Sequence, residues 1–169
     1  MPSATIDLSK VLYAKVPSKK PESSSLLASV KRIEKQTFPP SEAFDFDSEL
    51  CKRTTNLYCA YLHCPISSTP YQLYGYIVFL RTRMLTRIHK VCVVESLRGQ
   101  GLGGFMIGKV IEELKRGKAS EVDLWVDTQR APARSLYRKY GFEEQETVEE
   151  YYGKSRAGVR MSLRLQGPT

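Results

Sequence analysis

The sequence predicts an α/β fold of the α+β type, in which helices flank a mixed, mostly antiparallel central sheet. Two segments of alternating residues, 57–63 and 71–82, are typical of antiparallel strands joined by a turn. The second half alternates strand-like and helical segments and closes with two more strand-like segments, giving the order β-α-β-α-β-β. A chain of 169 residues is long enough for one such domain with a sizeable core.

The N-terminal half is expected to supply two helices and a meander of strands. Apolar residues near 3.6-residue spacing predict a helix that Ser25 caps and that Pro39 and Pro40 stop. Residues 1–22, rich in Pro, Lys and Ser, are expected to form a partly flexible arm. The expected elements are a strand within 10–16, a helix at 25–38, a second helix within 41–54, and strands at 57–63, 71–82 and 86–94.

The C-terminal half is expected to place two helices between strands. Leu102, Met106, Val110 and Leu114 fall on one helical stripe, and Gly141 is a candidate C-cap for the second helix. The expected elements are a helix at 101–115, a strand at 121–127, a helix at 131–140, and a closing hairpin of 142–152 and 158–165.

Composition and charge narrow the class of protein. Hydrophobic residues make up 41% of the chain and no apolar run reaches the length of a membrane span, so we expect a cytoplasmic protein without a membrane partner, with the nucleus left open. The net charge of +8 attracts polyanions, but no nucleic-acid motif accompanies it, so no nucleic-acid partner is expected. His63, His89 and the four cysteines lack metal-ligand spacing, so no metal site is expected either.

A glycine-rich loop follows the strand that ends near Val94 and precedes a helix. This position presents unpaired helix N–H groups, and glycines let a phosphate approach the backbone. Gly99, Gly101 and Gly104 spell G-x-G-x-x-G, the fingerprint of a dinucleotide site, with Asp127 as its acidic residue. Only about 65 residues follow, too few for the rest of a doubly wound nucleotide domain. A dinucleotide-binding Rossmann protein is therefore kept as a remote alternative.

A second pattern in the same loop is more specific. The segment 98–103 also matches [Q/R]-x-x-G-x-[G/A], and the segment 133–142 matches A-x-x-L-Y-x-x-x-G-F. With these two motifs the chain resembles the GNAT family of N-acetyltransferases from about Leu26 to Leu165. The resemblance implies the GNAT fold over residues 23–169 as a single acetyltransferase domain. It also implies acetyl-CoA as the cofactor and an acyltransferase reaction that acetylates a primary amine by direct attack on the thioester.

The resemblance assigns a set of residues to the cofactor. The backbone of the glycine loop would hold the pyrophosphate, and the strand before it would pair with the pantetheine arm. Where many members have Asn three residues before the signature alanine, this chain has Arg130, a cation long enough to reach a cofactor phosphate. The implied cofactor-binding residues are Val91, Val93, Arg98, Gly99, Gln100, Gly101, Leu102, Gly103, Gly104 and Arg130.

The resemblance also assigns catalytic roles. Tyr137 matches the family's general acid, which returns a proton to the leaving thiolate, and an N–H near Val93 would stabilise the oxyanion. His89 corresponds in position to a histidine used by the arylalkylamine branch, and its usual pKa near ~6.5 suits removal of the amine proton. Relatives that act on protein N-termini carry Glu or His on the fifth strand, where this chain has Trp125. His89 as base and His89 as a structural residue both stay open.

The acceptor is either a peptide N-terminus or a small amine, since the sequence resembles both the N-terminal-peptide and the arylalkylamine branches. The acidic residues of segments 42–49 and 143–150 favour a cationic acceptor. A monomer or weak homodimer is expected, and a non-catalytic module that only binds acyl-CoA is the alternative to an enzyme. The implied acceptor-binding residues are Phe38, Pro39, Pro40, Arg87, Tyr151 and Tyr152.

Overall fold

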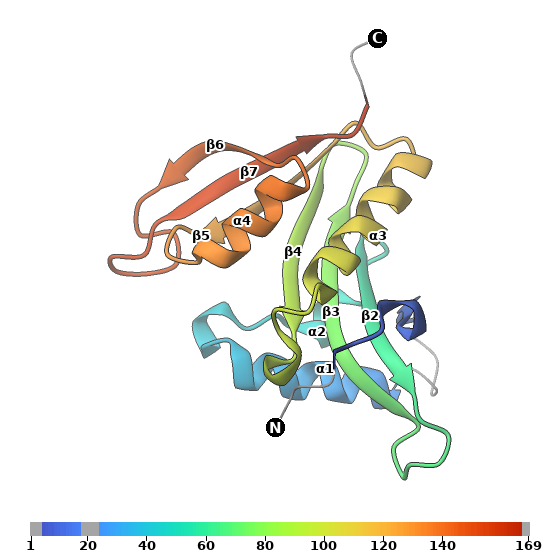
Figure 1. The fold of residues 1–169 in the computed structure, drawn as a ribbon. Helices are drawn as coiled ribbons and strands as arrows, with labels where there is room; N and C mark the ends of the chain where they lie inside the picture. The colour runs from blue at the N-terminus through green and yellow to red at the C-terminus, as the bar shows by residue number, and fades with distance from the viewer. Residues whose placement is uncertain (1–4, 18–23, 167–169) are drawn as a thin grey trace. The chain divides into compact units, whose positions relative to one another are not determined.

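A computed structural model describes residues 5–17 and 24–166 (Figure 1). The chain forms two compact units, the first within residues 1–78 and 90–106 and the second within residues 79–89 and 107–169. Among the described residues, no helix combines the length and the apolar character that a membrane span requires.

The described residues form the expected mixed sheet with flanking helices, which confirms the predicted fold class. Hydrogen bonding joins the strands in the order β1-β2-β3-β4-β5-β7-β6. The pairs β1/β2, β5/β7 and β6/β7 are antiparallel, and β4/β5 is parallel. The strands are β1 (Leu12–Lys15), β2 (Thr55–His63), β3 (Tyr71–Arg81), β4 (Thr86–Val93), β5 (Glu121–Asp127), β6 (Glu143–Val148) and β7 (Gly158–Arg164). The α-helices are α1 (Ser24–Thr37), α2 (Phe46–Glu49), α3 (Leu102–Arg116) and α4 (Ala131–Lys139).

Most element predictions are confirmed within a residue or two, but the second helix is much shorter than expected. A 3-10 turn covers Pro40–Glu42, and α2 holds only Phe46–Glu49. Asp45 starts α2 as its N-cap, because its carboxylate accepts a hydrogen bond from the Ser48 N–H. In the N-terminal arm, β1 confirms the expected strand, whereas residues 1–4 and 18–23 lie outside the described residues.

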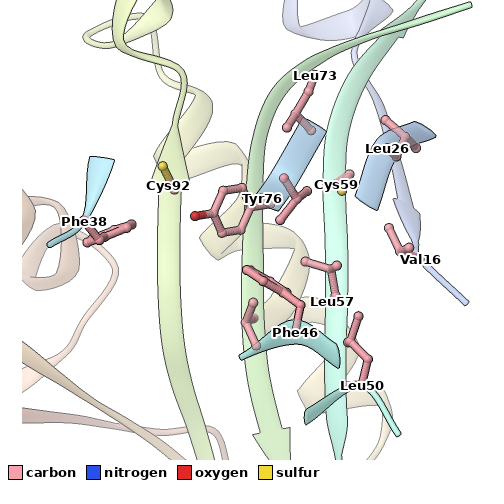
Figure 2. Packing of buried hydrophobic residues seen from close by; sticks show 12 residues of the cluster. Val16, Leu26, Phe38, Phe46, Leu50, Leu57, Cys59, Leu73, Tyr76 and Cys92 are labelled. Atoms are coloured by element: carbon pink, nitrogen blue, oxygen red, sulfur yellow. The ribbon is translucent and has the colours of Figure 1, made fainter. Parts of the chain in front are cut away.

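In the first unit, α1 and α2 cover one face of β2, β3 and β4. Apolar side chains from these elements pack into a single buried cluster, and Figure 2 shows Tyr76 of β3 within it, its hydroxyl directed toward β4. Phe46 packs edge-on to Tyr76, with 6.0 Å between the ring centroids. The fully or largely buried members are Val16, Leu26, Val30, Phe38, Phe46, Leu50, Leu57, Cys59, Leu73, Tyr76, Val78 and Cys92.

The opposite face of β3 is covered by the first turns of α3, and Gly75 makes this close packing possible. A Cβ at Gly75 would lie 2.6 Å from the carbonyl oxygen of Cys92 and 2.9 Å from the Cε of Met106. Successive side chains of a strand point to opposite faces, so Met106 lies on the face away from Tyr76 and α1. Only a residue without a side chain fits between β4 and α3 at this point.

In the second unit, β5, β7 and the later turns of α3, with Ile107, Val110 and Leu114 buried, supply the apolar core. Val122, Leu124 and Val126 of β5 and Val159 and Met161 of β7 are all buried. The helix α4 ends as expected. Gly141 follows the cap residue in a left-handed conformation with φ +91°, and its N–H donates to the Arg138 carbonyl. The strand β6 is exposed along its whole length.

We predict that Gly75→Ala destabilises the protein and that Gly108→Ala does not. A methyl group at Gly75 overlaps backbone, so the cost should be ~1–3 kcal/mol. A methyl group at Gly108, inside α3, would lie 3.6 Å from the ring of Tyr140, an ordinary contact. There alanine should stabilise the helix by up to ~1 kcal/mol. Urea unfolding of the two variants measures both effects. Equal stabilities would show that β3 and β4 can separate at Gly75 without cost.

Candidate active site

The glycine loop in the first unit turns the end of β4 into the start of α3. After the 3-10 turn Glu95–Leu97, the backbone is left-handed at Gly99, with φ +75°, and at Gly101, with φ +86°. Residues with a Cβ rarely adopt this conformation, so both positions require glycine. Leu102, the first residue of α3, is only 1% exposed and anchors the helix in the core.

The loop has the features that phosphate binding requires. The N–H groups in the first turn of α3, which includes Gly103 and Gly104, have no acceptor within the helix, and the positive end of the helix dipole lies there. A Cβ at Gly99 would meet no atom within 4 Å, so the surface of the loop is accessible at that residue. The residues present therefore fit a bound pyrophosphate.

Two side chains of the loop are engaged within the protein. Arg98 donates from Nε to the carbonyl oxygen of Val93 at 3.1 Å and so ties the loop back to β4. The side-chain oxygen of Gln100 accepts a hydrogen bond from the Ile6 N–H at 2.8 Å. Leu8 lies 3.5 Å from the position of a Cβ at Gly101. The N-terminal segment thus packs on the loop, a contact that the sequence did not predict.

A buried carboxylate lies at the end of α1, beside the segment that joins α1 to α2. Glu34 is 3% exposed. Its Oε2 accepts from the hydroxyl of Tyr76, and its Oε1 accepts from the Phe44 N–H at 2.9 Å. Burial raises the pKa of Tyr76, which therefore donates as a neutral phenol.

Lys90 of β4 completes this polar cluster. Its ammonium lies 3.1 Å from Glu34 Oε1, donates to the Glu42 carbonyl at 2.5 Å, and stands 3.6 Å above the centre of the Phe38 ring. These three partners engage the Lys90 ammonium within the protein. Of the predicted acceptor residues in this segment, Phe38 is buried, whereas Pro39 and Pro40 are exposed.

In the second unit, Arg87 is bound to a partner that the sequence did not reveal. Its guanidinium donates from Nε to Oδ1 of Asp123 at 2.7 Å and from Nη2 to Oδ2 at 2.6 Å. This hydrogen-bonded pair raises the pKa of Arg87. Arg160 of β7 lies 3.7 Å from the same carboxylate. Arg87 therefore balances the charge of the buried Asp123. His89, two residues further along β4, is exposed.

The two predicted acceptor tyrosines form an aromatic cluster. Tyr151 stacks on Trp125 with ring centroids 4.3 Å apart and an angle of 10°, and Tyr152 packs edge-on to Tyr151 at 4.9 Å. A Cβ at Gly158 would lie 2.8 Å from the Tyr151 ring, so the absence of a side chain there admits the ring. Tyr151 is nevertheless 45% exposed and can contact a ligand.

Tyr137, the predicted acid, is buried in α4 beside Phe142, with ring centroids 5.9 Å apart. Burial raises the pKa of Tyr137 to about 12, an effect that the charge of Arg130 partly opposes. An ordinary phenol ionises near ~10. Tyr137 departs from this value because its hydroxyl is removed from water.

The structure argues against two other sequence expectations. Burial tends to raise the pKa of Asp127, but bonds from the Gln129 N–H and Arg156 hold it below its usual range. The Asp127 carboxylate is therefore already bonded within the protein and does not present itself to a ribose. The antiparallel pairs β5/β7 and β6/β7 also differ from the parallel sheet of a Rossmann domain, so the dinucleotide alternative is excluded. Four acidic residues of the two segments, Asp47, Glu49, Glu144 and Glu146, are also paired with cations within their units, which weakens the inference of a cationic acceptor. The pairs are Lys31–Asp47, Lys52–Glu49, Arg134–Glu144, Arg138–Glu144 and Arg160–Glu146.

Residues 27–142 match the model of the acetyltransferase (GNAT) family. The chain belongs to this family. Its relatives include an uncharacterised N-acetyltransferase of Methanocaldococcus jannaschii, 36% identical over 69 residues, which are 41% of this chain and 30% of that protein. The match thus spans less than a third of the length of this relative.

Solved GNAT structures share the fold over nearly the whole chain. The structure of Arabidopsis thaliana NAA60 with acetyl-CoA has a TM-score of 0.76 and 17% identity, covering 93% of this chain and 99% of that one. A chain of the NatC complex bound to Gag peptide and CoA has a TM-score of 0.75 and 20% identity, with the same coverage.

The predicted site residues divide between the two units. The glycine loop, Val91, Val93 and Phe38–Pro40 belong to the first unit. The second holds Arg87, His89, Arg130, Tyr137, Tyr151 and Tyr152. The Glu34–Lys90 pair was missed, although a signal existed. Leu26, Val30, Glu34 and Phe38 are spaced by four residues, so Glu34 interrupts an apolar helical stripe, and Lys90 interrupts the buried side of β4 between Ile88 and Cys92.

We predict that Tyr137→Phe makes stability less sensitive to alkaline pH. The unfolded phenol ionises near ~10, and the folded one only at about 12. A pKa raised in the folded state gives stability that is complete below pH ~10 and is lost as the pH rises toward 12. At ~1.4 kcal/mol per pKa unit, the loss approaches roughly 3 kcal/mol in the wild type. Urea unfolding at several pH values between 8 and 11 compares the slopes. Parallel curves would mean that the hydroxyl reaches solvent.

Proposed function

We propose that the protein is an acetyltransferase that uses acetyl-CoA to acetylate a primary amine. The observation that carries the proposal is the glycine loop, left-handed at Gly99 and Gly101 and followed directly by the N-terminus of α3, in a chain of the GNAT family. A GNAT chain of the same fold, NAA60, has been solved with acetyl-CoA, which supports the choice of cofactor.

Acetyl-CoA supplies an acetyl group activated as a thioester. The backbone N–H groups of residues 98–104 bind the pyrophosphate, aided by the dipole of α3. The backbone of Val91 and Val93 pairs with the pantetheine arm as an added strand would. The Arg98 side chain donates a hydrogen bond to the Val93 carbonyl. We therefore expect it to stabilise the conformation of the loop, with its backbone N–H rather than its guanidinium available to the pyrophosphate. Arg130, exposed at the start of α4, supplies a cation for a phosphate group.

Tyr137 holds the proton that the leaving thiolate needs. With its pKa raised to about 12, the phenol keeps this proton throughout the physiological pH range. A thiol is a stronger acid, with a pKa near ~8.5, so full transfer of the proton from this phenol to the free thiolate is uphill. We therefore expect Tyr137 to act by donating a hydrogen bond to the charge that develops on sulfur as the carbon–sulfur bond breaks.

His89 is the proposed acceptor of the amine proton. It is exposed on β4, and its usual pKa near ~6.5 suits the task. The fifth-strand position that holds Glu or His in some relatives carries Trp125, whose ring is stacked on Tyr151 and has no basic group. If His89 is the base, His89→Gln removes the rise of kcat/KM with pH near neutrality. A rise that persists with acceptors of different amine pKa would assign the base elsewhere.

A peptide N-terminus is the acceptor that we favour. The exposed face of Tyr151 and the adjacent Tyr152 offer an aromatic surface and two hydroxyl groups to an extended backbone. Internal ion pairs occupy Asp47, Glu49, Glu144 and Glu146, which leaves a polycationic small amine fewer carboxylates to contact. A chain of similar fold in the NatC complex has been solved with a peptide, which supports this choice by analogy.

The test is acetyl-CoA binding followed by thiol release with a panel of peptides, aralkylamines and polyamines. We expect acetyl-CoA at a hundredfold excess over Kd to stabilise the protein by roughly 2.7 kcal/mol, and NAD to have no effect. Peptides with a free N-terminus should release thiol fastest, and the same peptides with an acetylated N-terminus are the matched control. Binding without release with any amine would identify a non-catalytic acyl-CoA module. Release only with small amines would reassign the acceptor.

We predict that Tyr137→Phe lowers kcat on the order of 10²-fold, the low end of the range for a general acid, and leaves the KM for acetyl-CoA nearly unchanged. The hydroxyl is needed when the thiolate leaves, so its loss acts on the transition state. Steady-state kinetics with the best acceptor of the panel measures both constants. An unchanged kcat would reduce Tyr137 to a packing residue of α4.

A further inference from the structure

The segment that joins α1 to α2 is attached to the core by one ion pair at two points near its α2 end. Lys90 binds the Glu42 carbonyl, and the Glu34 carboxylate accepts from the Phe44 N–H. Lys90 and Glu34 are themselves 3.1 Å apart. Pro39, Pro40 and Ser41, which lie between these attachments and Phe38, are exposed.

An ion pair is not required to fill this part of the core. The charged side chains are almost fully covered, with 13% of Lys90 and 3% of Glu34 exposed. Apolar side chains of similar size often stabilise a core as well as a buried ion pair does. They would offer no donor to the Glu42 carbonyl and no acceptor to the Phe44 N–H. What the charged pair adds beyond packing is a fixed position for the segment.

The same cluster connects the segment to the strand that leads to the glycine loop. Lys90 is next to Val91 in β4, and the thiol of Cys92 lies 3.8 Å from the Thr37 hydroxyl at the end of α1. Tyr76 of β3 holds the second oxygen of Glu34. Within the first unit, the place of Phe38–Pro40 is thereby set relative to the backbone of Val91 and Val93.

We propose that Glu34 and Lys90 are positioning residues that hold segment 38–44 in the conformation that binds the acceptor. This inference rests on the proposed function and on the acceptor contact that the GNAT resemblance implies for Pro39 and Pro40, which are exposed. It predicts an effect on the acceptor alone. The glycine loop, which binds acetyl-CoA, makes none of the contacts described for the pair.

The test is the double variant Glu34→Gln/Lys90→Met, which removes both charges and so leaves neither unpaired. The new glutamine would retain an acceptor for the Phe44 N–H, whereas the new methionine cannot donate to the Glu42 carbonyl. We expect the KM for the acceptor to rise on the order of 10-fold, as for the loss of a hydrogen bond to a charged group. The kcat at saturating acceptor and the Kd of acetyl-CoA should stay unchanged. Hydrogen exchange of the amides in segment 38–44 should become faster.

The matched control is Lys31→Met. It removes an exposed ion pair between α1 and α2, the two helices that the segment joins, in which Lys31 lies 2.5 Å from Asp47. It should change neither the KM nor the exchange. If the double variant does not fold, Lys90→Arg takes its place: it keeps a cation opposite Glu34 but changes the geometry of the donor to the Glu42 carbonyl, and the same KM and exchange are compared.

The outcomes separate this inference from the proposed function. Faster exchange with an unchanged KM would overturn the inference while the acetyltransferase remains established by turnover. Unchanged exchange would also overturn it, because the pair would then be structural only. If the wild type releases no thiol with any amine, the proposed function fails and with it the role in acceptor binding, whatever the exchange shows.

Discussion

The carboxylate of Glu34 is the point at which four distant parts of the chain meet. It lies in α1 and receives hydrogen bonds or an ion pair from the segment after α1, from β3 and from β4. A charge without partners would be too costly to bury here, so the carboxylate is stable only when all of these parts are in place. Tyr76, one of its donors, belongs to the apolar cluster of Figure 2, and apolar packing would tolerate small displacements that these polar contacts do not. The packing of α1 on the sheet is therefore fixed by a polar interaction as well as by hydrophobic burial.

The strand β4 carries two sets of residues with different tasks. Ile88, Lys90 and Cys92 face the core, where Lys90 holds the segment after α1. Arg87, His89, Val91 and Val93 alternate with them, and the strand then enters the glycine loop. One strand thus supplies the proposed cofactor backbone, the proposed base and the anchor of the acceptor segment. A side chain at Gly75 would push against the Cys92 carbonyl and displace β4. Such a displacement would affect the proposed cofactor backbone, the proposed base and the anchor of the acceptor segment together.

The sequence predicted the elements and the loop well because their signals are local. The stripe of α3, the alternation of β2 and β3 and the glycine at the end of α4 depend on residues a few positions apart. It failed where the outcome depends on a partner far along the chain. The pairing of Arg87 with Asp123 across parallel strands was not predicted, and the contact of Arg87 with the acceptor stays a prediction. The raised pKa of Tyr137 was missed because depth of burial cannot be read from a helical motif. Glu34 and Lys90 each interrupt an apolar pattern in the sequence, one in α1 and one in β4. That the two form an ion pair depends on the fold and could not be predicted from either pattern alone.

The hydrogen bond between Ile6 and Gln100 makes the N-terminal segment part of the environment of the glycine loop. The N-terminal segment and a ligand of the loop would then both contact the same surface, so the docking of the segment and the binding of the ligand are coupled equilibria. By thermodynamic linkage, a ligand that binds more tightly when Ile6 is docked must strengthen that docking by the same free energy, and a ligand that displaces Gln100 must weaken it. The affinity of the loop for such a ligand would then depend in part on residues that precede the first strand.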